Sequence, residues 1–561
     1  MRFGRKGQKR FGLVGLVLSA GCTYAVSGEA CFLRDGDVWV FHGDSITHAD
    51  TYRRLCERVF RHYHPEARAE FIQAGVWGST SSDLVKKIKE EGRKPAVVSL
   101  MLGMNNAING AWIKGQPRGP HLEAYRRDIS EFVRKYKAEG AAVILLSPTL
   151  ADETVRRTVF RIEGANEFLR DCGRIVKEVA AAEGACYVPA QAEFEAFQET
   201  LDPAQRLRPD GVHPASLGEY QIARTLWERL NFAGSLGPGP RALSEPAPRL
   251  PVNLRLATRF LAPDASGLAF TIEPSGGAGA PPKLAASWSL GEQHGTAEFE
   301  TAAKSWTLTP PKGLPALKAG GAADAVIELK AGDRSALFVV DLCAVPVLHF
   351  KDNAISGAID SAADRPEGRR VAAWTLRRNG GELLLEVEVT DSKLDSASEW
   401  AWGRDGLNLF WDLRPAERFA DINLDADVHQ TLVNVQDQPF FAVALRPWLG
   451  AGMEYAATAG GERTTTGYRV RFRLNQGFGL HRPLALEQRD FIGLSIIVVD
   501  ADGGQTAFHE AIPPQRPHDQ YANNLPILDL KAKLTGDSVH DAHVFPPPAH
   551  PPGNGPTEGR P

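Results

Sequence analysis

The sequence predicts an α/β protein with a three-layer, doubly wound parallel sheet in its N-terminal domain and all-β sandwich domains in its C-terminal half. Two observations lead to this fold class. Between residues 37 and 232, short β-rich runs alternate with longer amphipathic runs, which is the pattern of βαβ units. Beyond residue 252 the helical period disappears, and β-branched, aromatic or alternating runs are punctuated by Gly, Asp and Pro.

Strands and helices are expected to alternate through the N-terminal domain. The expected strands cover residues 38–42, 69–73, 96–102, 142–146 and 185–188. The expected helices, which carry apolar residues at spacings of three and four, cover residues 51–63, 80–91, 121–138, 162–182 and 216–231. This succession predicts a parallel sheet with helices on both faces.

The composition changes at residues 234–251, where Gly, Pro and Ser interrupt the periodic pattern and indicate a linker. A first domain is therefore expected at residues 31–233. The β-rich half is expected to form a small sandwich at residues 252–345 and a larger one at 346–532. Residues 533–561 are rich in proline and are expected to be disordered.

The first 30 residues have the features of a signal peptide. A basic segment precedes the apolar run 11–20, which is too short to span a bilayer comfortably. Small residues permit cleavage after Ala25 or after Ala30, and Cys22 offers lipid attachment as an alternative. The sequence predicts export to the periplasm or the extracellular space, and no later run is apolar enough to cross a membrane.

Composition limits the partners of the chain. The formal net charge of −4 shows no basic excess that would neutralise a phosphate backbone, so nucleic acid is not an expected partner. The cysteines are too thinly spread for a disulfide framework. Cys172 and Cys186 either pair across a helix-to-strand connection or remain buried thiols.

Ser45 follows the first expected strand directly, in the run Gly43-Asp44-Ser45. It stands at the carboxyl edge of the sheet, where doubly wound folds bind their ligands. The start of the next helix there offers partial positive charge to a developing anion. Because Gly-Asp-Ser is also an ordinary turn and capping sequence, the interpretation of Ser45 as a nucleophile needs partners elsewhere in the domain.

Asp210 and His213 supply such partners, in a segment just before the last expected helix of the domain. A spacing of three residues lets Asp210 accept the Nδ1–H of His213, which leaves Nε2 free to take the hydroxyl proton of Ser45. Either residue alone would be interpreted as an ordinary loop residue. Together they predict the base and its orienting carboxylate.

Two further loops follow the second and third expected strands and carry Gly78 and Asn105. Acyl transfer builds negative charge on a carbonyl oxygen, which hydrogen-bond donors must meet. Gly78 can bring a backbone N–H close because it has no side chain, and Asn105 can offer its side-chain amide. With the backbone N–H of Ser45, they are the expected oxyanion hole.

Residues 37–232 resemble the SGNH hydrolases, also called GDSL-type esterases, whose four sequence blocks match Ser45, Gly78, Asn105 and the pair Asp210 and His213. The resemblance implies a flavodoxin-like three-layer fold and a serine acyl-enzyme mechanism. It implies no cofactor for catalysis, and no His, Asp or Glu cluster in this domain has convincing metal-ligand spacing.

The larger β-rich segment contains the run Trp400-Ala401-Trp402 and, shortly after it, Asn408. Residues 345–532 resemble family 9 carbohydrate-binding modules. The resemblance implies that Trp402 stacks on a sugar ring and that Asn408 stands at a sugar-contacting position. It also implies structural calcium, for which three aspartates are candidates in this sequence, namely Asp421, Asp425 and Asp427.

The expected function is that of an exported carbohydrate esterase, a serine hydrolase that removes acyl groups such as acetyl from a polysaccharide. Fusion to a sugar-module-like domain would raise its effective concentration on a polymer. Two alternatives stay open at this point. One is a lipid hydrolase of the lysophospholipase or thioesterase kind, and the other is a catalytically silent surface binding protein.

Overall fold

The computed structural model describes the chain between residues 31 and 545 with gaps. It covers residues 31–87, 94–109, 115–155, 161–201, 207–208, 210–236, 243–244, 248–274, 281–317, 321–360, 370–391, 393, 405–413, 428–434, 441–447, 459–474, 486–502, 505–510 and 525–545. The expected signal peptide, Cys22, Trp402 and the three calcium candidates lie outside the described residues. No helix in the described ranges combines the length and the apolar character needed to cross a membrane.

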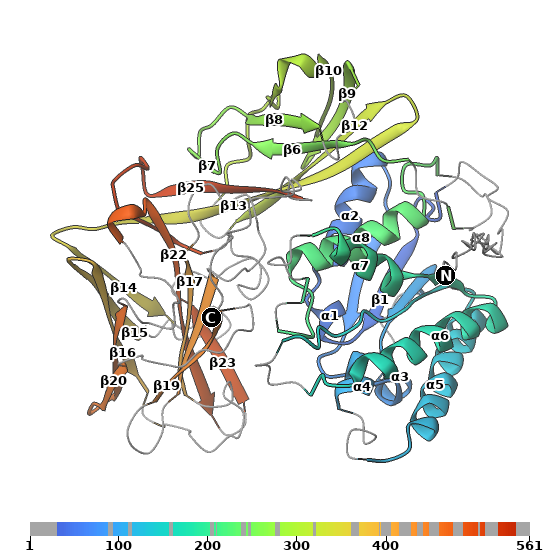
Figure 1. Cartoon of the computed structure of the whole chain (residues 1–561), viewed down its shortest axis with the longest axis horizontal. Coiled ribbons are helices and arrows are strands. Elements are labelled where there is room, and N and C mark those ends of the chain that lie inside the picture. Colours follow the sequence, from blue (N-terminus) through green and yellow to red (C-terminus); the bar gives the residue numbers. More distant parts are fainter. Residues whose placement is uncertain are drawn as a thin grey trace, which may run out of the picture.

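The N-terminal domain is built on a five-stranded parallel sheet in the order β2-β1-β3-β4-β5, as in flavodoxin-type doubly wound sheets (Figure 1). Its strands are β1 (Val38–Gly43), β2 (Glu70–Gly75), β3 (Val97–Met101), β4 (Ala142–Leu146) and β5 (Cys186–Val188). Residues Trp39 to Phe41 of β1 are buried because helices cover both faces of the sheet. This part of the structure confirms the predicted α/β arrangement.

The helices of this domain form two groups, one on each face of the sheet (Figure 1). Their bounds are α1 (Ser45–His48), α2 (Thr51–Tyr63), α3 (Ser81–Lys87), α4 (Met104–Ile108), α5 (Arg118–Ala138), α6 (Ala165–Glu183), α7 (Ala190–Glu199) and α8 (Ser216–Arg229). Helix α6 begins later than predicted because Gly164, with φ of 75°, has a left-handed backbone that ends the preceding turn. Helices α1, α4 and α7 were not predicted.

Within the described ranges, the sheets of the C-terminal half are antiparallel apart from one parallel strand pairing, and this confirms the predicted β character. The strands of the largest sheet are β7 (Phe260–Leu261), β9 (Lys283–Leu290), β10 (Gln293–Glu300), β12 (Ala322–Ala331), β13 (Arg334–His349), β17 (Gly406–Asp412), β18 (Val428–Asn434), β19 (Phe441–Pro447), β22 (Phe491–Asp502), β23 (Gln505–Glu510), β24 (Ile527–Asp529) and β25 (Ser538–Phe545). A three-stranded sheet contains β6 (Val252–Leu256), β8 (Leu268–Pro274) and β11 (Ser305–Leu308), and a five-stranded sheet contains β14 (Ala354–Asp360), β15 (Arg370–Asn379), β16 (Glu382–Thr390), β20 (Ala459–Arg463) and β21 (Gly467–Leu474).

The predicted division of this half at residues 345 and 346 differs from the structure, because that position lies inside the long strand β13. The first part of β13 pairs with β12 and β25, and its last residues pair with β24. Proline often marks the edge or the end of a strand, but Pro346 lies within β13 and stands opposite Ser538 of β25. One strand therefore belongs to both parts of the β-rich half.

The start of the predicted disordered tail also differs from the structure. Residues 538–545 form β25, which pairs with β13 on one side and with β7 on the other. Val539, Ala542 and Val544 of this strand are buried. The high proline content of the chain end concealed this short strand, whose pairing partners precede it by about 200 residues or more.

The parallel-sheet domain and the β-rich half share one hydrophobic core, since Val326, Val339 and Phe545 pack with the core of that domain. The ring of Phe545 stacks on that of Tyr220, with centroids 5.7 Å apart. Polar contacts join the same surfaces, including the hydroxyl of Tyr63, which donates to Glu328 at 2.9 Å. The linker residues thus connect two parts that pack against each other.

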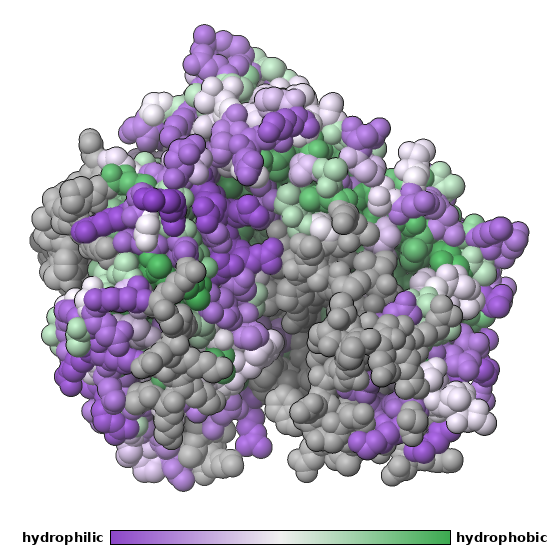
Figure 2. Space-filling view, turned by 180° about the vertical axis from the view of Figure 1, so that it is seen from behind, coloured by the Kyte–Doolittle hydropathy of each residue, from purple (hydrophilic) through white to green (hydrophobic). Residues whose placement is uncertain are grey.

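The described surface in Figure 2 is mainly hydrophilic, with apolar residues in small separate patches. This distribution is normal for a protein surface in contact with water. Cys172 carries a buried free thiol, as one of the two interpretations predicts, whereas the free thiol of Cys186 is only partly buried.

Candidate active site

Ser45 is the first residue of α1, immediately after β1 ends at Gly43. The carboxylate of Asp44 caps this short helix by accepting the N–H of Ile46 at 3.0 Å. A side chain on Gly43 would meet the hydroxyl of Thr47 and the carbonyl of the neighbouring strand, so only glycine allows the chain to turn this tightly. The turn places Ser45 at the carboxyl edge of the sheet, as predicted.

The structure brings Ser45, His213 and Asp210 into one hydrogen-bonded chain. Ser45 Oγ lies 2.9 Å from His213 Nε2, and His213 Nδ1 lies 2.8 Å from Asp210 Oδ2. The second carboxylate oxygen, Oδ1, accepts the backbone N–H groups of Val212 and His213 at 2.8 and 2.7 Å. Gly211, with φ of 90°, permits this hairpin-like return of the backbone. The carboxylate is thereby held in the position that orients the imidazole.

Gly78 and Asn105 lie in the loops that follow β2 and β3, the two strands that flank β1. Gly78 has φ of 69°, a left-handed backbone that favours glycine. The side-chain amide of Asn105 donates to the carbonyl of Ser79 at 3.1 Å and has a second N–H. The structure therefore gathers the predicted oxyanion donors at the sheet edge that carries Ser45.

A polar network that the sequence did not single out holds these two loops together. Ser81 donates its hydroxyl to buried Asp128 on α5 at 2.8 Å. Asn106 accepts the backbone N–H of Ser81 and donates to its hydroxyl, both at 3.1 Å. Because Asn106 is next to Asn105, this network fixes the position of the predicted oxyanion donor. Ser81 and Asp128 are 47 residues apart, so no local pattern links them.

Asp44 is buried next to Ser45. Burial raises the pKa of its carboxyl from 3.8 to about 6, and the N–H of Ile46 and the nearby His213 offset only part of this effect.

Replacing Asp44 with asparagine is expected to change how stability depends on pH. The raised pKa means that the folded chain holds the proton of Asp44 more tightly than the unfolded chain does. The stabilisation that this proton gives the folded state is therefore present below pH 3.8 and is lost as the pH rises through about 6. Asparagine is neutral and still caps α1. Between about pH 4 and pH 7 the variant should gain up to about 3 kcal/mol relative to the parent. Thermal unfolding of both proteins across this range measures the effect, and a difference independent of pH would contradict it.

The structure does not place Asn408 as a sugar contact. It lies on β17, between β18 and β22, and is only 6% exposed. Little of this side chain is therefore accessible to a ligand, which differs from the expectation of a sugar contact.

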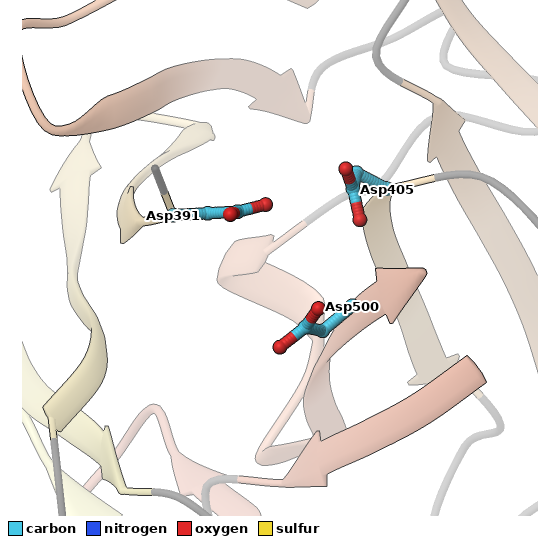
Figure 3. A group of neighbouring side chains, drawn as sticks. All are labelled: Asp391, Asp405 and Asp500. Carbon is cyan, nitrogen blue, oxygen red and sulfur yellow. The ribbon is translucent and has the colours of Figure 1, made fainter. Parts of the chain in front are cut away.

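Figure 3 shows a set of carboxylates in the β-rich half that the sequence did not indicate. Asp391 directly follows β16, Asp405 directly precedes β17, and Asp500 lies on β22. Their carboxylate oxygens fall within 4.8 Å of one another. Such oxygens are the ligand type that hard cations such as Ca²⁺ prefer. The three residues come from segments up to about a hundred residues apart, so sequence spacing could not reveal the cluster.

Comparison with known proteins identifies the N-terminal domain. Residues 41–220 match the family model of the GDSL-like lipases and acylhydrolases. The chain is 26% identical over 219 residues to an acetylxylan esterase from Geobacillus stearothermophilus, a match that covers 35% of this chain and 95% of that protein.

Two solved structures also show similarity to a part of the chain. One is a catalytic mutant of an acetylxylan esterase from Geobacillus stearothermophilus, with 24% identity, coverage of 36% of this chain and 96% of that one, and a TM-score of 0.32. The other is an α/β hydrolase enzyme from the metagenome of Lake Arreo, Spain, with 23% identity, coverage of 37% and 100%, and a TM-score of 0.32. From the family match, residues 41–220 form a GDSL-like lipase/acylhydrolase domain, and the protein is a hydrolase of ester bonds.

Proposed function

We propose that the protein is an exported serine esterase that removes acyl groups, acetyl above all, from a carbohydrate. The observation that carries this proposal is the chain of contacts from Ser45 through His213 to Asp210, with distances of 2.9 and 2.8 Å. A serine, an imidazole and a carboxylate in this arrangement are the components of nucleophilic acyl transfer.

In the proposed mechanism, His213 Nε2 takes the proton of Ser45 as Oγ forms a bond to the ester carbonyl carbon. The carbonyl oxygen becomes negative, and the N–H groups of Ser45, Gly78 and Asn105 stabilise it. The bond to the alcohol oxygen then breaks, and His213 gives its proton to that oxygen. Water, activated by His213, attacks the acyl-enzyme in the same way and restores the Ser45 hydroxyl. Asp210 stabilises the imidazolium in both halves.

These steps use side chains and backbone N–H groups alone, so we propose that catalysis needs no cofactor. Asp210 and His213 also differ in their access to solvent. Asp210 is buried, whereas the His213 side chain is 28% exposed and so accessible to substrate from solvent. His213 is thus held by Asp210 through Nδ1 and is accessible from solvent, which suits a base that reacts with a dissolved ester.

Two observations support a carbohydrate as the substrate. The similar curated protein is an acetylxylan esterase, and the match covers nearly all of it. The basic and apolar start of this sequence also fits export, which would bring the enzyme to polysaccharides outside the cell. In this proposal the β-rich half would hold the esterase near a polymer and raise its effective concentration there.

The substrate class is tested by incubating the purified full chain with acetylated xylan, pectin, acetylated monosaccharides and lysophospholipid, and measuring the acid released. The proposal expects acetate from at least one carbohydrate and much slower release of fatty acid from the lipid. Faster release from lysophospholipid would contradict a carbohydrate substrate and favour a lipid hydrolase. The full chain is needed because β13 and β24 belong to the sheet that packs on the hydrolase domain.

Replacing Asn105 with alanine is expected to lower kcat by about 10²-fold to 10³-fold, since removal of one oxyanion donor costs about 3–4 kcal/mol of barrier. KM should change little if the amide acts chiefly in the transition state. Steady-state kinetics with 4-nitrophenyl acetate provide the measurement.

The matched control for this variant is Asn109→Ala, which removes only the amide that donates to Asn105 Oδ1 at 3.3 Å. Its loss should stay within about tenfold, because one neutral hydrogen bond is worth roughly 0.5–1.5 kcal/mol. Equal losses in the two variants would show that the effect of Asn105 is structural.

A further inference from the structure

Trp77 follows β2 and presents an exposed indole beside His213. The side chain is 58% exposed, and Val76, exposed by 40%, is the only other large hydrophobic residue exposed in the part of the chain that the structure describes. The centroid of the Trp77 ring lies 6.4 Å from the ring centroid of His213 and 5.2 Å from that of His48. A tryptophan can bury roughly 150–250 Å² of surface, so an exposed indole beside the candidate catalytic histidine offers a large apolar surface to a ligand.

The backbone that carries Trp77 is held firmly against α1. The N–H of Val76 donates to the carbonyl of Gly43 at 3.0 Å, and His48 Nδ1 lies 3.1 Å from the carbonyl oxygen of Gly75. A Cβ on Gly75 would come within 2.5 Å of the backbone nitrogen of His48, which shows how closely the two segments approach. The turn that carries the serine therefore sets the position of the backbone from which the indole extends.

The position of Trp77 relative to His213 indicates which part of an ester would rest on it. In acyl transfer by a serine, the histidine hands its proton to the leaving alcohol oxygen, so the alcohol part lies on the histidine side. Gly78, the next residue in the chain, is the proposed donor to the oxyanion. A group that covers the indole is therefore attached to the alcohol oxygen and is not the acyl chain.

We propose that Trp77 is a substrate-binding residue whose indole stacks on a pyranose ring of the alcohol part of the ester. The C–H groups of a pyranose form an apolar face that matches an aromatic plane, while its hydroxyl groups stay in contact with water. The indole N–H adds a hydrogen-bond donor at the edge of the ring. This inference rests on the proposed carbohydrate esterase function and names the residue that recognises the sugar.

The test compares the variants Trp77→Ala, Trp77→Phe and the matched control Val76→Ala with the parent. For each, kcat/KM is measured with methyl tri-O-acetyl-β-xylopyranoside and with ethyl acetate, whose alcohol has no ring. The ratio of the two values should fall about tenfold in Trp77→Ala, mainly through KM, because one stacking contact is lost. The ratio should be largely kept in Trp77→Phe and unchanged in Val76→Ala.

A second readout does not depend on deacetylation of sugars. Unesterified xylobiose should inhibit ethyl acetate hydrolysis competitively, and its inhibition constant should rise about tenfold in Trp77→Ala. If the parent releases no acetate from sugars but shows this inhibition, the proposed function is wrong while sugar binding by Trp77 is supported. If the parent deacetylates sugars, and Trp77→Ala changes neither the kcat/KM ratio nor the inhibition constant of xylobiose, sugar binding by Trp77 is wrong while the proposed function is supported.

Three further outcomes would overturn the role of Trp77. Equal losses on ethyl acetate and on the acetylated xyloside would mean that the side chain only shapes the loop next to Gly78. A loss confined to lysophosphatidylcholine would mean that the indole binds a quaternary ammonium head group through a cation–π contact. Absence of both sugar deacetylation and xylobiose inhibition in the parent would contradict the inference and the proposed function together.

Discussion

Replacing Ser45 with alanine is expected to lower kcat for 4-nitrophenyl acetate by about 10⁴-fold or more, the scale on which serine hydrolases respond to loss of the nucleophile. The reason is the 2.9 Å contact between Ser45 Oγ and His213 Nε2 at the edge of the parallel sheet. Without the hydroxyl no acyl-enzyme can form, and only the weaker effects of the oxyanion donors and of substrate binding remain. Turnover equal to that of the parent would rule out the serine mechanism.

The same series should show that the three residues act together. His213→Ala is expected to cost about as much as Ser45→Ala, and the double variant should cost little more than either alone. Asp210→Asn keeps the shape but provides an amide where the imidazole needs a carboxylate, and a loss of about 10⁴-fold in kcat is expected. Thermal unfolding serves as the control for folding, and additive losses in the double variant would contradict a shared mechanism.

Replacing Asp541 with alanine is expected to destabilise the protein by about 3–5 kcal/mol, the usual cost of removing one member of a buried ion pair. Asp541 lies on β25 and is fully buried, and its Oδ2 accepts Nη2 of Arg259 at 2.6 Å. His543 Nε2 lies 3.0 Å from its Oδ1. Burial alone would raise the pKa of Asp541, but the positive charges of Arg259 and His543 outweigh it and lower the pKa.

The measurement is the midpoint of the first unfolding transition of the full chain in urea or on heating. The control is the double variant Arg259→Met with Asp541→Leu, which replaces both members of the closest ion pair by apolar side chains and should recover part of the lost stability. The recovery should be partial because Asp412, whose Oδ2 lies 3.7 Å from Arg259 Nη2, stays buried. If Asp541→Ala unfolds like the parent, β25 contributes nothing to the fold, as the expected disordered tail would require.

Local patterns were sufficient for the predictions about the N-terminal domain. The strand at residues 38–43 is recognisable because its apolar run is followed at once by a glycine and a helix cap. The spacing of Asp210 and His213 predicts their contact, because three residues of loop suffice to bring a carboxylate back to Nδ1. Where the predictions failed, as for the short α1 and α4, the helices have four and five residues and leave no periodic signal.

The predictions about the β-rich half were weaker for a physical reason. Strand pairing there depends on which distant segment covers which apolar face, and alternation along one strand carries no information on its partner. The sequence therefore predicted the β character of this half, but the division at residue 345 and the tail from residue 533 differ from a structure in which β13 and β25 pair. The cluster of Asp391, Asp405 and Asp500 was invisible for the same reason.

The sequence by itself determined the α/β character of the first domain, the β character of the rest and the identity of Ser45, Gly78, Asn105, Asp210 and His213 as candidates. These follow from residue types and short spacings, which act through local backbone geometry. Only the tertiary structure decided that Ser45 Oγ lies within a hydrogen bond of an imidazole 168 residues away, that β25 completes the large sheet, and that Trp77 stays exposed beside His213. Such contacts depend on long-range burial and loop closure, which no local pattern specifies.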